Sequence, residues 1–263
     1  MVKEIQEENL IDVLHLLHKD SVTNCYILSD LDVLGLKHPS LSLYGQFNKG
    51  KIESILMLFN RYAIFYSNAD KIETAMIELI NRIKPFAISG GAYSIKQLLE
   101  YIHPVKEKTY TLAVLSKDNY VNTKAKDPNI RILKSNKDLQ SLYLLLKDIK
   151  EFNVSSQDMN QFIKEKKIIN QAGNSYGLFI NNQLCSSAST LTETKDYAVI
   201  NGVATKNEFR NKGYANKLVD RIIYDYITVK NKSLILYYNN EIAARMYLKK
   251  GFKPYGTWIS LNL

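Results

Sequence analysis

The order of strand-like and helix-like segments constrains the fold of this chain more than any other feature. From residue 130 onward, short runs rich in apolar residues alternate with longer stretches whose apolar residues recur every three or four positions. Strands are predicted at 130–133, 176–180, 184–191, 197–205, 234–238 and 255–263, and helices from Ser135, after Ser156, and at 211–229 and 240–250. This order, β-α-α-β-β-β-α-β-α-β, predicts an α/β fold, of the α+β kind with a mixed sheet.

The N-terminal half ends in a similar order of segments. Strands are predicted at 61–66, 85–89 and 109–115, and helices at 69–84 and 93–102. Matching segments of the two halves lie about 135 to 150 residues apart, which indicates two copies of one fold in tandem. The alternative is a chance match, because β-α-β-α-β is a common order. The polar stretch 119–129 is the best linker candidate, so we expect domains at 1–120 and 128–263.

The composition is that of an ordinary globular protein, with 46% hydrophobic and 23% charged residues. No run approaches about 18 uninterrupted apolar residues, and the first residues lack the apolar core of a signal peptide. We therefore expect a cytoplasmic protein that makes no membrane contact. Cys25 and Cys185 lie far apart, and His15 and His18 have no further ligand at a suitable spacing, so no metal site is predicted.

The most informative local pattern is a strand that leads into a basic, glycine-containing turn and then a long helix. It spans residues 203–215, and Arg210, Lys212 and Gly213 lie in the turn. The first N–H groups of a helix have no internal partner and, with the helix dipole, form an anion site. Gly213 lets the backbone approach a phosphate without a Cβ in the way, and Ala215 keeps the next turn small. The segment predicts a pyrophosphate-binding loop, although such a helix start is common when it stands alone.

The positive charge of the chain lies in the same half as this loop. Residues 1–120 hold 13 Lys and Arg against 14 Asp and Glu, whereas residues 121–263 hold 22 against 12. The net charges are therefore −1 and +10, which indicates an anionic partner for the C-terminal half. A phosphorylated cofactor, a nucleic acid and a basic surface that serves only solubility all fit this charge. The sequence contains no recognised RNA-binding signature, so we expect no nucleic acid.

A second informative segment lies at residues 238–252. Asn240 is placed to cap a helix, and Tyr247 lies two turns further along that helix. Gly251 and Phe252 then return the chain to the last predicted strand.

Together the two segments resemble the GNAT superfamily of N-acetyltransferases. The family's first motif corresponds to Arg210-x-x-Gly213-x-Ala215, and its second to Asn240-x-x-Ala243-x-x-x-Tyr247-x-x-x-Gly251-Phe252. The element order from residue 130 to the C-terminus also agrees. The resemblance covers about half the chain directly and implies a tandem GNAT-like acyl-CoA N-acyltransferase fold.

The resemblance implies an acyl-CoA-dependent N-acyltransferase that carries acetyl from acetyl-CoA to a primary amine by direct attack in a ternary complex. The residues expected to bind the cosubstrate are Val203, Thr205, Arg210, Asn211, Lys212, Gly213, Tyr214, Ala215 and Asn240. The N–H of Val203 is expected to polarise the thioester carbonyl, and Val203 and Thr205 to hold the pantetheine arm. Tyr247 occupies the family's general-acid position, and its ordinary pKa of about 10 keeps it protonated at neutral pH.

Several parts of this function stay open. Glu193 and Glu208 match no family position, so we name no general base. The acceptor amine is not identified, and the sequence is compatible with a monomer or a homodimer. A non-catalytic protein that binds coenzyme A is the alternative, which the presence of Tyr247 disfavours.

The N-terminal half resembles the same fold in element order alone. At the position of the phosphate loop it has Ser67-Asn68-Ala69-Asp70, with no glycine and no arginine, so we interpret it as a degenerate copy without cofactor. We expect it to shape the acceptor site instead. Asp30 and Asp32 could attract a cationic amine there, although a solvated loop is the better explanation of these two residues.

Overall fold

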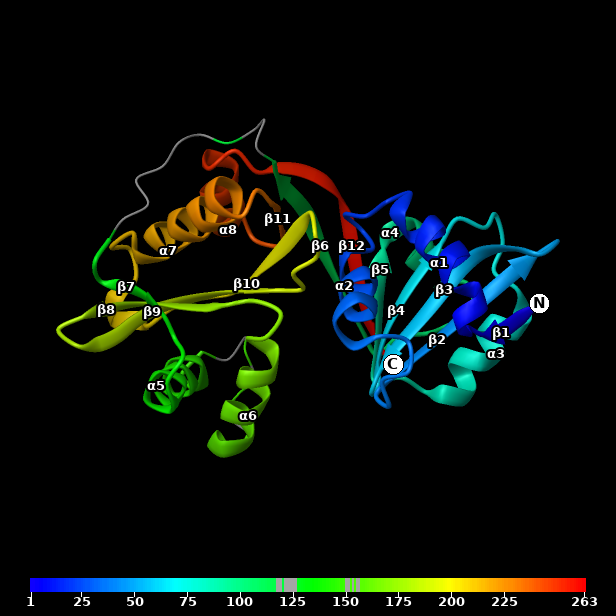
Figure 1. Cartoon of the computed structure of the whole chain (residues 1–263), viewed down its shortest axis with the longest axis horizontal. Helices are drawn as coiled ribbons and strands as arrows, with labels where there is room; N and C mark the ends of the chain where they lie inside the picture. Colours follow the sequence, from blue (N-terminus) through cyan, green and yellow to red (C-terminus); the bar gives the residue numbers. More distant parts are fainter. Residues whose placement is uncertain (117–119, 121–126, 150–151, 153, 155–156) are drawn as a thin grey trace. The chain divides into compact units, whose positions relative to one another are not determined.

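In a computed structural model, the chain is described at all residues except 117–119, 121–126, 150–151, 153 and 155–156 (Figure 1). It forms two compact units. Unit 1 comprises Met1–Leu112 and Pro254–Leu263, and unit 2 comprises Ala113–Lys253. The expected linker at 119–129 falls mostly outside the described residues, so the expected boundary at 120 and 128 stays a prediction. Across the described residues, every helix is too short or too polar to cross a lipid bilayer.

Unit 1 is a mixed sheet between two pairs of helices. Its elements are β1 (Val2–Glu4), a 3-10 turn (Glu7–Asn9), α1 (Leu10–His18), α2 (Cys25–Leu34), β2 (Leu41–Asn48), β3 (Lys51–Phe59), β4 (Tyr62–Ser67), α3 (Thr74–Ile83), β5 (Ala87–Gly91), α4 (Ala92–Leu98) and β12 (Lys253–Asn262). The strands run in the order β1-β2-β3-β4-β5-β12, and only the β4–β5 pair among them is parallel. One apolar cluster packs α3 and α4 on the sheet, and a second packs α1 and α2.

Unit 2 has the order of elements that the sequence predicts between residues 130 and 250. Its elements are β7 (Ile130–Ile132), α5 (Asn136–Lys147), α6 (Met159–Ile169), β8 (Ser175–Ile180), β9 (Gln183–Leu191), β10 (Tyr197–Thr205), a 3-10 turn (Asn207–Phe209), α7 (Tyr214–Ile223) with a π-helical extension (Tyr224–Val229), β11 (Ser233–Tyr238) and α8 (Glu241–Lys249). The strands run in the order β11-β10-β9-β8-β7, with β10 and β11 parallel. The predicted α/β fold with a mixed sheet is confirmed.

The two faces of the unit 2 sheet are covered by different helices. On one face, α7 and α8 pack on a cluster that includes Leu218, Ile222 and Tyr247. On the other face, α5 and α6 pack with Leu184 of β9 and Ala204 of β10. Residues of β9 and β10 therefore point alternately toward the two helix pairs, as the period of a strand requires.

The last strand pairs differently from what the element order of the C-terminal half suggests. β12 runs antiparallel to β5, with Trp258 opposite Gly91 and Leu261 opposite Ile88, so its core-facing residues belong to unit 1. β6 (Lys106–Leu115) contributes to both units. Its residues up to Leu112 belong to unit 1, and its last residues, from Ala113, belong to unit 2. The alternation of apolar residues identifies a strand, but it does not show with which sheet the strand pairs. For this reason the sequence analysis assigned β12 to the C-terminal half.

Candidate functional site

The pairing of β10 with β11 ends part of the way along β10. The ladder runs from Tyr197 opposite Ser233 to Ile200 opposite Leu236, and in the described structure it does not extend over residues 201–205. On the other side of β10, the register with β9 shifts between Asn201 and Ala204, where Gly202 has a φ of 63°. The end of β10 that carries Val203 and Thr205 therefore has a backbone edge that β11 does not cover.

The helix that follows β10 begins without a side-chain cap. α7 starts after Gly213, which has a φ of 75° and no side chain to cap the helix, and no side chain among the described residues accepts from its first N–H groups. By contrast, α5, α6 and α8 are capped by Ser135, Asp158 and Asn240. The first turn of α7 therefore keeps N–H groups for an external acceptor. A Cβ built on Gly213 would meet no atom within 4 Å, so the space in front of the helix is open.

Two cations lie beside this helix start, and both are held by nearby groups. The Arg210 Nε donates to the carbonyl oxygen of Thr205 at 3.2 Å, which ties the turn to the end of β10. The Lys212 ammonium lies over the Phe209 ring, 5.2 Å from its centroid, and that ring packs against Tyr214 at 6.3 Å. Because the arginine and the lysine are exposed, they add positive charge where the helix N-terminus already favours an anion.

Tyr247 lies on α8 with its ring in the apolar cluster beneath α7. It is 6% exposed and packs against Tyr238 and Phe252, with ring centroids 6.1 and 5.8 Å away. Burial raises the pKa of Tyr247 to about 12, so the phenol is protonated at neutral pH. No described residue hydrogen-bonds its hydroxyl, which leaves the O–H for a ligand.

Asn240 acts as a helix cap in this structure. Its Oδ1 accepts from the N–H of Ala243 at 2.9 Å. That oxygen already accepts a hydrogen bond within α8. Asn240 can therefore bind a cosubstrate by donating from its side-chain amide N–H groups.

Sequence reasoning missed an ion pair that joins the two helices of the site. The Nζ of Lys250, at the end of α8, lies 2.5 Å from Oδ1 of Asp220 on α7, and the Lys250 side chain is only 9% exposed. Lys250 directly precedes the Gly-Phe motif, and no local pattern links it to a residue 30 positions earlier. The pair fixes the spacing between the helix that offers the anion site and the helix that carries Tyr247.

Glu193 is not arranged as a proton acceptor. Its carboxylate accepts from Lys232 at 2.8 Å, from Lys230 at 2.9 Å and from the Tyr226 hydroxyl at 3.1 Å. Burial alone would raise the pKa of Glu193, but the hydrogen bonds and charges of the two lysines outweigh burial and lower it. Glu208 is exposed in the 3-10 turn that follows β10. The structure thus gives neither carboxylate the surroundings of a general base.

In unit 1 the corresponding strand end is occupied by the protein itself. The Ser94 Oγ of α4 accepts from the N–H of Ser67 at 2.9 Å, at the end of β4. Tyr93 and Gln97 donate to the carbonyl oxygen of Ala69, each at 3.1 Å. A ligand backbone that paired with Ser67 would have to displace the Ser94 side chain. The interpretation of this half as a degenerate copy stays a prediction.

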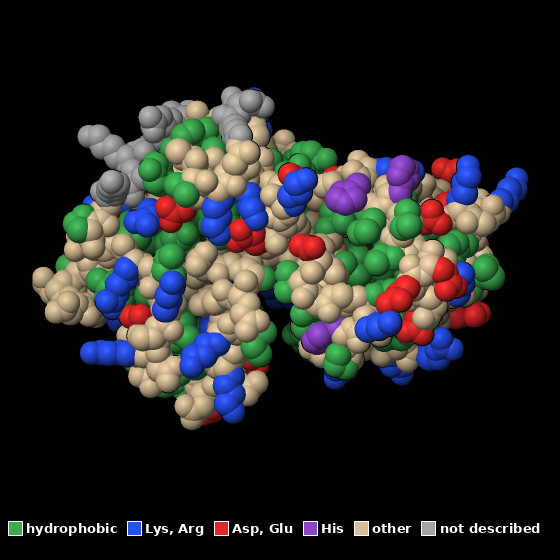
Figure 2. Space-filling model, viewed as in Figure 1, with side chains coloured by type: hydrophobic (Ala, Val, Ile, Leu, Met, Phe, Trp, Pro, Cys, Tyr) green, Lys and Arg blue, Asp and Glu red, His purple; other side chains and the backbone are tan. Residues whose placement is uncertain are grey.

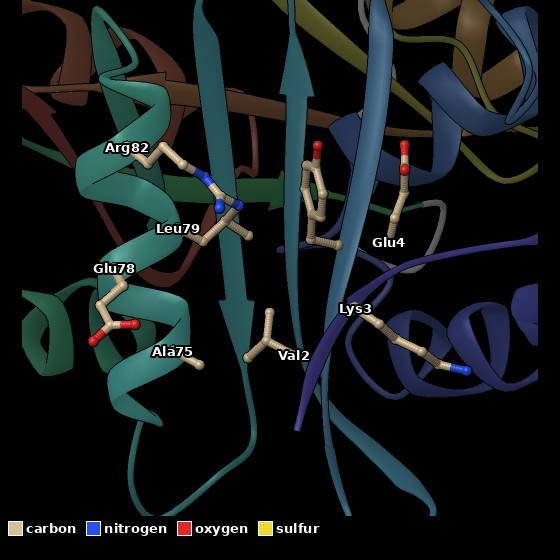
Figure 3. A pocket seen from close by; sticks show the side chains of 8 residues that line it. Val2, Lys3, Glu4, Ala75, Glu78, Leu79 and Arg82 are labelled. Atoms are coloured by element: carbon tan, nitrogen blue, oxygen red, sulfur yellow. The ribbon is translucent and has the colours of Figure 1, made fainter.

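A shallow cavity of about 400 Å³ lies elsewhere in unit 1, between β1 and α3 (Figure 3). Its lining mixes both charges: Lys3 and Arg82 with Glu4 and Glu78. It contains none of the predicted site residues. In the described part of the chain, no three His, Cys, Asp or Glu side chains gather closely enough to hold a metal ion.

Comparison with solved structures supports the tandem architecture. A GCN5-related N-acetyltransferase from Sphaerobacter thermophilus aligns with a TM-score of 0.68 and 11% identity, over 99% of this chain and 94% of that one. A tandem GNAT protein from the clavulanic acid biosynthesis pathway aligns with a TM-score of 0.66 and 12% identity, over 99% and 97%. A GNAT-family acetyltransferase from Colwellia psychrerythraea gives 0.59 and 14%, over 100% and 99%. At these identities the likeness concerns the fold.

The sequence itself matches a family model over part of unit 2. Residues 139–252 match the acetyltransferase (GNAT) family, a range that includes both motifs, most of α5, and the helices α6 to α8. No curated protein sequence matches the chain. Residues 139–252 therefore match the acetyltransferase (GNAT) family, and the chain as a whole has the fold of a tandem GNAT protein.

Proposed function

We propose that the protein is an N-acetyltransferase that uses acetyl-CoA and a primary amine. The observation that carries this proposal is the uncapped start of α7 next to the uncovered end of β10. An anion site and a free strand edge, side by side, suit a molecule with a pyrophosphate and an extended amide-containing arm. The match of residues 139–252 to the GNAT family supports acetyl-CoA as that molecule.

Each part of the cosubstrate has a matching group on unit 2. The pyrophosphate would accept from the first N–H groups of α7, beside Arg210 and Lys212. The space in front of Gly213 admits it, and the neighbouring residues Asn211, Tyr214 and Ala215 complete the turn. The pantetheine amides would pair with Val203 and Thr205 as an added strand would. Asn240 would contribute only through its amide N–H groups.

The reaction follows from the groups at the end of β10. A neutral amine attacks the thioester carbonyl, whose oxygen accepts from the backbone N–H of Val203, and a tetrahedral intermediate forms. The C–S bond then breaks as the C–N bond is completed. Tyr247 donates its proton to the leaving thiolate and regains one from solvent. The proton released by the amine passes to water, since neither Glu193 nor Glu208 is arranged to accept it.

The competing function is a domain that binds coenzyme A without catalysis. Incubation of the protein with acetyl-CoA and a panel of amines, with release of free thiol as the readout, separates the two. We expect thiol release that depends on the amine and an acetylated amine in equal amount. Binding of acetyl-CoA without amine-dependent thiol release would show that the domain does not catalyse the transfer. We place the protein in the cytoplasm, as its two widely separated cysteines suggest.

A further inference from the structure

α6 turns a single stripe of side chains toward the rest of unit 2. Phe162 and Ile163 are buried in that stripe, and Lys166 and Asn170 continue it in half-buried positions. The residues on either side of Lys166 are exposed. The spacing of three or four residues places Lys166 on the inner face of the helix, one turn before Asn170.

A chain of hydrogen bonds leads from this face to the irregular part of β10. The Ser189 Oγ of β9 donates to the Ser175 Oγ of β8 at 3.2 Å, and that hydroxyl donates to the Asn170 Oδ1 at 2.9 Å. Ser189 lies opposite Asn201 in the ladder, and a Cβ on Gly202 would come within 3.9 Å of its Oγ. The hydroxyl groups of Ser175 and Ser189 therefore link the inner face of α6 to β10, the strand beside which the thioester would bind.

Lys166 differs from two other lysines of unit 2 that are withdrawn from solvent, the half-buried Lys232 and the buried Lys250. Lys232 and Lys250 each reach a carboxylate, Glu193 and Asp220 respectively. The Lys166 ammonium has no hydrogen bond or ion pair with a described residue, and burial lowers its pKa. The ammonium is partly desolvated and no described carboxylate reaches it, so an anion that bound there would offset the cost of burying the charge. Further Lys and Arg side chains lie over α5 and α6 and strengthen the local positive potential (Figure 2).

We propose that Lys166 binds a carboxylate on the acceptor, so that the acceptors of this enzyme are amines that also carry a carboxylate group. This inference rests on the proposed acetyl transfer and specifies its substrate class. The amine of such a molecule would lie at the irregular part of β10, near Gly202, and its carboxylate would face α6. Asn201, which precedes Gly202, pairs with Ser189, the first member of the hydrogen-bond chain that leads to α6.

Two acceptors that differ only in charge test the proposal. 4-Aminobutyrate and 4-aminobutyramide have the same chain and the same amine, and only the first carries a carboxylate. A charged hydrogen bond is worth about ten- to a hundredfold in affinity, so we expect the wild type to favour 4-aminobutyrate in kcat/KM by about that factor. Lys166→Met should reduce kcat/KM for 4-aminobutyrate to the value for the amide, whereas Lys166→Arg should keep most of the preference.

Lys167→Met is the matched control, since Lys167 is the next residue and is exposed on the outer face of α6. It should leave the preference unchanged. If the wild type acetylates both acceptors equally well, or if Lys166→Met keeps the preference, the proposal is wrong. Longer pairs, such as 5-aminovalerate and its amide, should show the same loss in Lys166→Met.

A binding measurement decides the question without turnover. In isothermal titration of the protein with 4-aminobutyrate in the presence of coenzyme A, Lys166→Met should bind at least about tenfold more weakly than the wild type. Equal affinities would overturn the proposal. If no amine is acetylated at all, the proposed function fails, and this titration still tells whether Lys166 holds a carboxylate.

Discussion

At the scale of single residues, Tyr247 combines a buried ring with a hydroxyl that no described residue binds. Tyr247→Phe removes only that hydroxyl, so the packing against Tyr238 and Phe252 should survive. General acid catalysis contributes about 10²- to 10⁴-fold, and we expect kcat to fall within that range while KM for acetyl-CoA changes little. Steady-state kinetics measures both. A loss in kcat far below that range, about threefold or less, would leave Tyr247 with a packing role only.

The pH profile of kcat provides an independent control for the same residue. Because burial raises the pKa of Tyr247 to about 12, its acid form persists through the neutral and mildly alkaline range. We therefore expect kcat to show no decline from loss of this acid until the pH approaches that value. A decline of kcat centred near the ordinary phenol pKa, about 10, that disappears in Tyr247→Phe would contradict the buried environment.

Gly213 has a left-handed φ of 75° and faces open space where the pyrophosphate would lie. Gly213→Glu adds a carboxylate to the proposed anion site, and we expect it to abolish acetyl-CoA binding. Gly50→Glu is the matched control, because Gly50 has a φ of 81°, equally open surroundings and a place in unit 1. Isothermal titration should find one site per chain in the wild type and in Gly50→Glu, since Ser94 occupies the corresponding strand end of unit 1. Two equivalent sites, or normal binding by a folded Gly213→Glu, would contradict this assignment.

Asp30 is half-buried on α2, and burial raises its pKa from 3.8 to about 6. A carboxyl whose folded pKa exceeds its unfolded pKa stabilises the protein below the unfolded value, and that stability is lost as the pH rises through the folded pKa. Asp30→Asn should therefore raise Tm at pH 8, with a smaller effect at about pH 4. Thermal unfolding at both pH values measures the difference. Asp32→Asn, at an exposed position of the same helix, should change Tm little at either pH, and equal shifts in both variants would refute the role of burial.

At the scale of elements, the Asp220–Lys250 pair links α7 to α8. Lys250→Met leaves the Asp220 carboxylate without its partner, and we expect the free energy of unfolding to fall by about 1–3 kcal/mol. The spacing between the two helices should also change, so kcat should fall with it. Replacing both residues, with Asp220→Leu added to Lys250→Met, should recover much of the stability, because the remaining groups are apolar. Urea denaturation measures these differences, and a double variant no more stable than Lys250→Met would contradict the account.

Most helices and strands of unit 2 could be predicted because their side-chain periods match the faces they bury. Leu218, Val219, Ile222 and Ile223 form the stripe that α7 buries, and the turn before it carries the glycine and the basic residues of the GNAT motif. Contacts between distant segments could not be predicted in this way. The spacing from Phe162 and Ile163 places Lys166 on the inner face of α6, but the sequence does not show which groups that lysine meets there. Side-chain period locates an inner face, but it does not show which polar groups lie opposite.

At the scale of the whole molecule, each unit includes a piece of strand from the other half of the sequence, and we call this an exchange of strands. β12 follows α8 of unit 2 but pairs with β5 of unit 1, and β6 contributes Ala113 and Leu115 to the core of unit 2. Element order predicted two copies of one fold, which the likeness in fold to a solved tandem GNAT protein confirms. The exchange was beyond sequence reasoning, because each strand has an apolar period that either sheet could bury. The expectation that the N-terminal half shapes the acceptor site stays a prediction.

The exchange of strands predicts that the C-terminal half will not fold when it is expressed alone. A fragment of residues 121–263 keeps Trp258, Ile259 and Leu261 but loses β5, against which this strand packs. It also loses Ala113 and Leu115 from its core, so we expect no cooperative unfolding by circular dichroism and no acetyl-CoA binding by titration. The control is the full chain with a protease site inserted at residues 121–126 and then cleaved. Both pieces are present there, so β12 keeps its partner, and the cleaved protein should stay associated and bind acetyl-CoA. A fragment that unfolds cooperatively and binds as the full chain does would show that the exchanged strands are dispensable for unit 2.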